Sequence, residues 1–183
     1  MFCPSMLGGR SWNPGSYNPE TGVWFNSRQE MCEIAKTRPE RPKMKPVPAW
    51  YMGADLQWVH PPGDTAHGAI DAWDPLTGKK KWSVHDKYPR ISGVLSTKGG
   101  LVFSADMKGY VYAYDADTGK ELWKFNMGSG SRGGLISYTA GGEQYILVPS
   151  GLGSAAQGVT AQVFPEVAEL PAGGTLFAFK VPK

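Results

Sequence analysis

Residues 110–114 alternate regularly between the two faces of an extended chain. Val111 and Ala113 share one face and three tyrosines share the other, and this period of two is typical of a β-strand. The next stretch, 115–120, combines Asp, Thr and Gly, which favour chain reversal through side-chain hydrogen bonds and positive φ. A second extended run ends on Trp123. The pattern therefore predicts an antiparallel hairpin.

The same hairpin occurs earlier in the chain, and this repeat is the strongest internal signal. Residues 68–82 align with residues 109–123 at an offset of 41 residues, and 7 of the 15 aligned positions are identical. Weaker copies of the turn and of the first strand stand at 18–24 and 174–179. The hairpin unit therefore occurs about three to four times.

Each full copy ends on a tryptophan, Trp82 or Trp123. An indole ring can cover a neighbouring sheet while its N–H bonds a carbonyl, so both rings should be largely buried between sheets. Further strand pairs are predicted around Gly-Gly turns at 94–104 and 136–148. A period of about 40 residues built from hairpins is typical of a propeller blade. The sequence thus predicts an all-β protein, a β-propeller of four-stranded antiparallel blades.

Residues 1–183 are expected to form part of one propeller domain with two loop insertions, at 36–66 and 153–171. The first insertion is rich in proline and lacks periodicity, and the second carries a short helical turn over 164–170. The chain suffices for about three blades, whereas closed propellers use four to eight. An open ring exposes sheet edges. We therefore expect a partner, either an N-terminal polypeptide holding the other blades or further copies of the chain.

Charge and composition narrow the function classes. The net charge of +3 is mild and the basic residues are scattered among acidic ones, so we expect no nucleic-acid binding. No apolar run approaches the roughly 20 residues that span a bilayer, so no membrane span is expected. The first residues lack the features of a secretory signal, so either the chain stays in the cytoplasm or its export signal lies in sequence outside it. Cys3 and Cys32 form a disulfide or remain two buried thiols, and the residues alone leave both open.

Four stretches carry a family resemblance. The motif Ala-x-Asp-x-x-Thr-Gly-Lys-x-x-Trp occurs at 72–82 and 113–123, and residues 2–14 and 93–103 follow the same family pattern. Together they resemble the eight-bladed methanol and ethanol dehydrogenases that depend on pyrroloquinoline quinone (PQQ), in which the repeated motif is the tryptophan-docking motif. The resemblance covers nearly the whole chain. It implies the C-terminal portion of such a subunit, about three blades of an eight-bladed ring.

The resemblance also implies a reaction and its participants. In that family PQQ and a Ca²⁺ or lanthanide ion lie at the propeller axis, an Asp removes the hydroxyl proton of an alcohol, and hydride passes to the quinone. The catalytic Asp and the metal ligands are implied upstream, so no catalytic or metal-binding residue is assigned in this chain. A cytochrome c as electron acceptor, a periplasmic location and a Cys3–Cys32 disulfide are likewise implied by the resemblance.

Three residues match positions where that family commonly contacts PQQ, namely Ser11, Ile91 and Ala155, and their neighbours Trp12, Gly153 and Ser154 complete a set of six candidate cofactor-binding residues. Ser11 stands where an Asn is usual, Ile91 where a Trp is common, and Ala155 next to a place where a Gly-Trp pair is common. The smaller or less polar side chains imply a roomier pocket for a bulkier alcohol, with Ser11 and Trp12 still supplying contacts. The alternative is a propeller that has lost PQQ, and we favour the first.

Other candidate chemistry is weaker. His60, Asp64 and His67 have no fixed geometry as metal ligands, and a solvated loop is expected there. The Gly-rich stretch 128–134 lacks the helix and lysine of a phosphate loop and is expected to join two blades, facing the axis. Four aspartates, Asp71, Asp74, Asp115 and Asp117, are expected to be structural residues of blade turns. A different class of function stays open, a non-catalytic propeller module that binds proteins.

Overall fold

The computed structural model of the chain describes residues 1–38, 53–63, 66–153 and 155–180. Its elements, in order, are β1 (Ser16–Asn18), β2 (Val23–Gln29), β3 (Cys32–Thr37), β4 (Ala54–Val59), β5 (Gly68–Asp74), β6 (Lys79–Asp86), β7 (Val94–Ser96), β8 (Leu101–Ala105), β9 (Tyr110–Asp115), β10 (Glu121–Asn126), β11 (Ile136–Ala140), β12 (Glu143–Ser150), the helix α1 (Ala155–Val163), the 3₁₀ helix η1 (Pro165–Glu169) and β13 (Thr175–Lys180).

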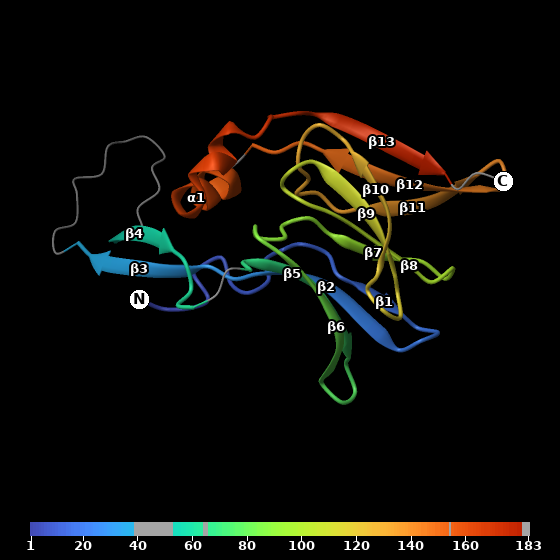
Figure 1. Ribbon diagram of the computed structural model, residues 1–183, viewed down its shortest axis with the longest axis horizontal. Coiled ribbons are helices and arrows are strands. Elements are labelled where there is room, and N and C mark those ends of the chain that lie inside the picture. The colour runs from blue at the N-terminus through green and yellow to red at the C-terminus, as the bar shows by residue number, and fades with distance from the viewer. Residues whose placement is uncertain (39–52, 64–65, 154, 181–183) are drawn as a thin grey trace.

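The strands form three blade-like antiparallel sheets and one separate hairpin (Figure 1). The first sheet has the order β1-β2-β5-β6, the second β7-β8-β9-β10, and the third β11-β12-β13. The β3–β4 hairpin is inserted between β2 and β5 of the first sheet. The predicted all-β class and the four-stranded antiparallel blades are confirmed, with two complete sheets and a third of three described strands.

The two full repeats fold as the predicted hairpins, β5–β6 and β9–β10. In the first turn the carboxylate of Asp74 accepts hydrogen bonds from the backbone N–H of Leu76 and from the Thr77 hydroxyl, at 2.9 and 2.8 Å. In the second turn Asp115 accepts the equivalent bonds from the backbone N–H of Asp117 and from the Thr118 hydroxyl, at 3.2 and 2.7 Å. Both turns close on a glycine with positive φ. The turn chemistry of the repeat therefore fixes where each blade reverses.

Asp71 departs from its expected place at a blade turn. It lies in the middle of β5, only 1% of its side chain is exposed, and it pairs with Arg28 of β2 at 2.9 Å. The hydroxyl of Ser83 on β6 also donates to it. A carboxylate buried inside a sheet needs such partners to offset its desolvation. Asp71 therefore has a structural role, but the predicted position at a turn is wrong.

The two repeat tryptophans have different surroundings. The Trp82 indole N–H donates to the Ala116 carbonyl in the next sheet at 2.9 Å, and its ring packs against Gly119 and Phe25. Trp123 instead remains 39% exposed, so the expected burial is wrong for this ring within the chain. The physical reason is its position: the third sheet ends at β13 among the described residues, and no further turn stacks over Trp123.

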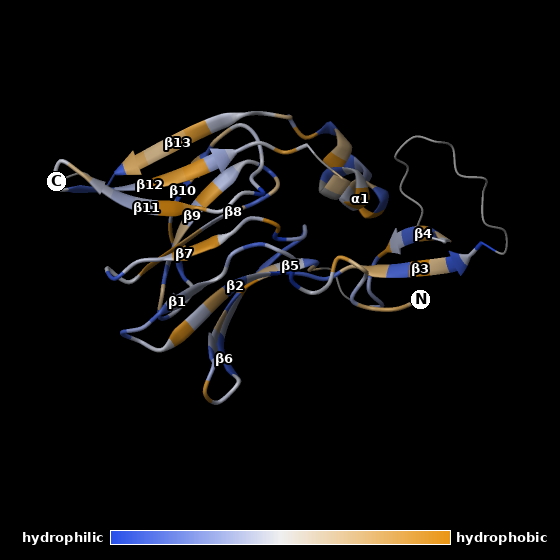
Figure 2. Cartoon of the chain, turned by 180° about the vertical axis from the view of Figure 1, so that it is seen from behind, coloured by the Kyte–Doolittle hydropathy of each residue, from blue (hydrophilic) through white to orange (hydrophobic). Residues whose placement is uncertain are grey.

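Three apolar clusters hold the sheets together. The first fills the space between the first and second sheets and includes Phe25, Ile70 and Val102. A similar cluster between the second and third sheets is supplied partly by the hydrophobic residues that recur along β12 and β13 (Figure 2). The third cluster joins α1 and η1 to the loops beneath them. Burial of these faces is the main stabilising contribution to the stack.

Both predicted insertions carry more regular structure than a loop. Residues 36–66 include the end of β3 and all of β4, which pair along their full lengths, while most of the proline-rich part lies outside the described residues. In 153–171 the helix α1 precedes the shorter η1, so the predicted turn over 164–170 is present but is not the main element. No helix in the described part of the chain is long and apolar enough to cross a membrane.

Candidate cofactor-binding site

Three loops meet where the chain enters the first strand of each sheet. They are residues 9–15 before β1, 87–93 before β7 and 127–135 before β11. The N–H of Gly93 donates to the Gly133 carbonyl at 3.0 Å, and the next residue, Val94, donates to the Pro14 carbonyl at 2.9 Å. One backbone segment thus bonds to both neighbouring loops. The glycine-rich loop 127–135 joins two blades as predicted.

A fourth segment, the end of β12 and the start of α1, joins the same group of loops. The N–H of Gly151 donates to the Gly130 carbonyl at 2.7 Å, and Leu152 bonds the Ser129 hydroxyl at 3.1 Å. At Gly130 a Cβ would lie 2.4 Å from the Met107 carbonyl oxygen, so glycine is required for this close packing. All the loops that carry the predicted site residues are therefore in mutual contact.

Buried polar groups fix the middle loop. The Ser92 hydroxyl bonds the Ser104 hydroxyl at 3.0 Å, and the Ser92 carbonyl accepts from the Ser27 hydroxyl at 2.8 Å. Arg90 is almost fully buried, with its guanidinium 2.9 Å from the Asp86 carboxylate and 5.0 Å from the Tyr112 ring. The serine hydrogen bonds satisfy buried polar groups and the Arg90–Asp86 pair offsets a buried charge, so together they hold the backbone of the loop in one position.

Tyr112 extends this polar cluster into the second sheet. Its hydroxyl donates to the Asp106 carboxylate at 2.8 Å. Burial and the negative charge of Asp106 raise the pKa of Tyr112, so the phenol stays protonated and remains a donor. Asp106 also accepts from the backbone N–H of Tyr110. The cluster therefore acts as a structural connection between the first and second sheets.

The six predicted residues differ in what they offer to a ligand. Trp12 is 64% exposed and Ser11 is half-buried, so both present side chains at the surface of the loops. Ile91 is 7% exposed and packs beneath α1 with Leu152 and Met107, so it can supply only an apolar floor. Gly153 has a φ of +119° and Ala155 opens α1. Ser154 lies outside the described residues.

Sequence reasoning missed two side chains beside these residues, both in the loop 127–135. The guanidinium carbon of Arg132 lies 5.8 Å from the centre of the Trp12 ring, within the range of a cation–π contact. The hydroxyl of Ser131 is buried without a hydrogen-bond partner among the described residues. The offset of 41 residues between Ile91 and Arg132, equal to the offset of the hairpin repeat, was an available signal.

The side chains present suit an organic anion better than a metal ion. An exposed indole, an adjacent guanidinium and an orphaned hydroxyl fit a planar cofactor that carries carboxylates such as PQQ. By contrast, no group of three or more His, Cys, Asp or Glu in the described ranges could hold a metal ion.

The two histidines of the 60–67 stretch differ in exposure, since His60 is exposed and His67 is buried. His67 is 2% exposed, and its Nε2 lies 2.8 Å from Nδ1 of His60. The Phe164 ring packs edge-on against both imidazoles, with ring centres 4.8 and 5.0 Å apart. The expectation of solvation is therefore wrong for His67, because the helical insertion covers it. Asp64 lies outside the described residues.

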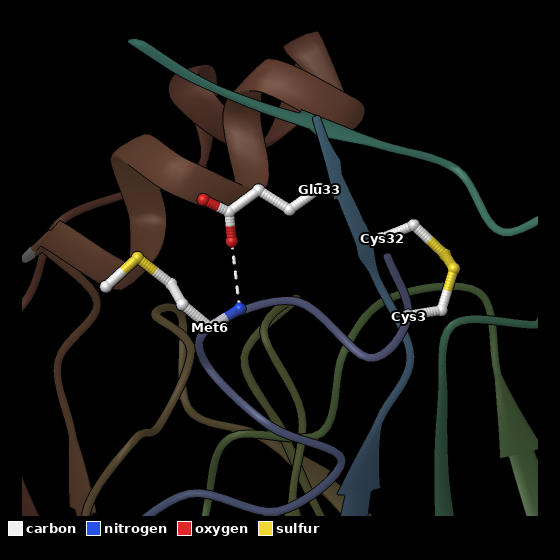
Figure 3. Close-up of a disulfide and its surroundings, with 4 residues drawn as sticks. All are labelled: Cys3, Met6, Cys32 and Glu33. Atoms are coloured by element: carbon white, nitrogen blue, oxygen red, sulfur yellow. Dashed lines mark hydrogen bonds between the residues drawn. A yellow bond between two sulfur atoms is a disulfide. The ribbon is translucent and has the colours of Figure 1, made fainter. Parts of the chain in front are cut away.

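A disulfide joins the N-terminal segment to β3 (Figure 3). It links Cys3 and Cys32, as the resemblance implied. Beside it, the buried Glu33 carboxylate accepts a hydrogen bond from the Met6 backbone N–H at 2.8 Å, and Phe2 and Glu33 form a β-bridge. These contacts anchor the start of the chain a few residues before Ser11 and Trp12, so they support one of the site loops.

Comparisons with known proteins agree with this arrangement. Residues 83–146 match the family described as glucose/ethanol/alcohol dehydrogenase, beta-propeller domain, of the PQQ type. The chain is 38% identical to quinoprotein alcohol dehydrogenase PedE of Pseudomonas putida, covering 98% of the chain and 28% of that relative. It is 36% identical to lanthanide-dependent methanol dehydrogenase of Methylorubrum extorquens, covering 83% of the chain and 25% of that relative.

Solved structures give the same result. A quinohemoprotein alcohol dehydrogenase from Pseudomonas putida superposes with a TM-score of 0.82 at 28% identity, over 97% of this chain and 27% of that one. A europium-containing methanol dehydrogenase gives a TM-score of 0.77 at 28% identity, over 98% and 34% of the two chains. The chain thus spans about a quarter to a third of the proteins that it matches. It belongs to the family of PQQ-dependent alcohol dehydrogenases, of which it is a C-terminal portion.

Proposed function

We propose that the chain supplies the C-terminal blades of a PQQ- and metal-dependent dehydrogenase that oxidises an alcohol to an aldehyde or ketone. The observation that carries the proposal is the meeting of the loops 9–15, 87–93 and 127–135 at one place, with the exposed Trp12 and the half-buried Arg132 side by side on them. PQQ, when bound, supplies the hydride acceptor, and Ca²⁺ or a lanthanide supplies the Lewis acid. The catalytic Asp and the metal ligands belong to blades upstream.

In this scheme the residues of this chain bind PQQ and orient it. The Trp12 ring offers a flat apolar surface and the Ser11 hydroxyl one hydrogen bond. Ile91 forms an apolar floor, and Gly153, Ser154 and Ala155 offer backbone groups and little side-chain bulk. Since Ile91 stands where a Trp is common and the stretch 153–155 lacks the Trp of the family pattern, we propose space for an alcohol larger than methanol.

The unpaired parts of the third sheet support completion by another polypeptide. A cavity of about 370 Å³ opens between the second and third sheets and is lined by apolar side chains that include Trp123, Ile146 and Phe179. Trp123 and Leu176 are exposed at 39% and 63%. Apolar surface and an unpaired strand edge of this kind favour pairing with further blades. We propose an N-terminal propeller polypeptide as the partner, with further copies of the chain as the alternative.

Location and electron transfer follow from the same proposal. The Cys3–Cys32 disulfide is compatible with an oxidising compartment, which supports a periplasmic location with the signal outside this chain. The electrons of the oxidised alcohol would pass to a cytochrome c. The docking role of the repeat tryptophans is also proposed, supported by the bond from Trp82 to the next sheet.

A second function, a non-catalytic propeller that binds proteins, is favoured by one specific observation. Ile91 is buried beneath α1, so a position where the family commonly contacts PQQ offers only an apolar surface and no polar contact. The Trp12–Arg132 pair does not separate the two functions, because tryptophan and arginine also carry many protein–protein contacts.

Reconstitution with the upstream blades tests the proposal. The chain and an upstream polypeptide would be combined with PQQ and either Ca²⁺ or a lanthanide, and reduction of an artificial electron acceptor by alcohols would be followed. We expect turnover that requires all components and increases from methanol to longer alcohols. A closed assembly that forms but reduces no acceptor with any alcohol would favour the non-catalytic module.

A further inference from the structure

The repeat places Arg132 and Ile91 at equivalent points of neighbouring blades. The two residues are separated by 41 residues, the offset that relates the two full hairpins, and Gly93 and Gly134 follow them at the same spacing. The loops also touch, since a Cβ on Gly93 would lie 3.0 Å from the Gly134 Cα. Arg132 therefore occupies, at the entry to β11, the place that Ile91 occupies at the entry to β7.

Arg132 is one of two described arginines without an ion pair to a described residue; the other, Arg10, donates a hydrogen bond to the Asn13 carbonyl and lies over the Trp24 ring. Arg28, Arg38 and Arg90 each lie within salt-bridge distance of a carboxylate. Arg132 has no ion pair with a described residue, and the aromatic ring it approaches, that of Trp12, is 64% exposed. A guanidinium presents a planar fork of donors that matches a carboxylate in two parallel hydrogen bonds. The Arg132 guanidinium, which no described carboxylate neutralises, can therefore bind an anionic ligand.

We propose that Arg132, held beside Trp12, binds a carboxylate of the cofactor while the Trp12 ring contacts its plane. The inference rests on the proposed function and deepens it, because it names a residue outside the six positions taken from the family pattern. PQQ carries three carboxylates, so cationic groups offset its charge. Ser11 and Ile91 replace more strongly interacting residues at two of the three blade entries, and Arg132 supplies a charged contact at the third.

The test is a titration of the full 183-residue chain with PQQ up to millimolar concentration, followed by NMR of the Trp12 indole N–H and the Arg132 side-chain N–H. The second ligand is the trimethyl ester of PQQ, which keeps the ring and lacks the negative charges. Arg132→Gln removes the charge, Arg132→Lys keeps it without the fork, and Arg38→Gln is the matched control. Arg38 pairs with Asp55 on the β3–β4 hairpin, away from the blade-entry loops (Figure 1).

We expect PQQ to shift both signals and Arg132→Gln to weaken PQQ binding about tenfold, as for loss of one charge-assisted hydrogen bond near the surface. Arg132→Lys should recover part of the PQQ affinity, and Arg38→Gln should bind PQQ like wild type. The trimethyl ester should bind wild type and Arg132→Gln equally weakly. Unchanged PQQ affinity in Arg132→Gln, or equal affinity of acid and ester for wild type, would overturn the inference and leave the proposed function intact. Absence of PQQ binding from both the chain and the reconstituted assembly would overturn both.

Discussion

Replacing Gly119 with alanine should destabilise the chain more than the same replacement at Gly78, although the two glycines close equivalent turns. Both have positive φ, +73° at Gly119 and +66° at Gly78, so an alanine meets a similar backbone strain of about 1 kcal/mol at each. The surroundings differ. A Cβ at Gly119 would lie 2.8 Å from the Trp82 ring, whereas no atom lies within 4 Å of one at Gly78.

The added methyl group forces the Trp82 ring to move. Overpacking costs about 1–3 kcal/mol. Displacement of the ring also weakens its 2.9 Å hydrogen bond to the Ala116 carbonyl, a net loss of about 1 kcal/mol. Gly78→Ala should therefore lower the free energy of unfolding by about 1 kcal/mol and Gly119→Ala by about 3 kcal/mol.

Urea denaturation of the two variants and the wild-type chain, followed by circular dichroism, measures the difference. The slope of unfolding free energy against urea should be the same in all three, because the variants bury the same surface. Equal losses of stability in the two variants, within about 0.5 kcal/mol, would refute the claim that Trp82 packs tightly on the turn of the next sheet.

Three further predictions follow from other contacts. Trp82→Ala should lower the unfolding free energy by about 3 kcal/mol and Trp123→Ala by less, since its ring is 39% exposed, and the reverse order in urea denaturation would contradict the packing described. The denatured, unreduced chain should show no free thiols, and replacing Cys3 and Cys32 by serine should cost about 3 kcal/mol; two titratable thiols would disprove the disulfide. A lysine hydrogen bond lowers the pKa of Glu166 from 4.5 to about 2, so its stabilising contribution is complete above pH 4.5 and is lost as the pH falls toward 2. Glu166→Gln should flatten the pH dependence of stability in that window, and an unchanged slope would show that the ion pair contributes nothing.

Local sequence patterns predicted the parts of the fold that local interactions determine. The hairpin repeat was predicted because alternation and the Asp-x-x-Thr-Gly turn act within a few residues. The strand β4 was missed because it pairs with β3 across a long proline-rich stretch, and no local pattern gives that pairing. The helix α1, which contains Gly158 and no charged residue, is stabilised by tertiary packing through Val163 against the loops below.

The candidate site, too, was predicted in part from the sequence. Motif resemblance identified the blade-entry loops that carry Trp12 and Ile91, because the family pattern fixes the position of a residue along the chain. It did not show that Ile91 faces the buried cluster under α1, or that His67 is covered by Phe164, because both depend on where the helical insertion packs. Arg132 was missed because the motif resemblance assigned no cofactor contact to the stretch 128–134, and only the spacing of Arg132 from Ile91 marks it.

The most direct test of the account is the dissociation constant of PQQ measured side by side for the chain alone and for the chain completed by the upstream blades, in the presence of Ca²⁺ or a lanthanide. The described residues offer an indole and a guanidinium but no set of metal ligands, so most of the affinity should come from the missing blades. We expect PQQ to bind the completed ring at least about 100-fold more tightly than the chain, a difference of about 3 kcal/mol. Equal affinities, with alcohol oxidation by the chain alone, would contradict the claim that this polypeptide is one part of a shared site.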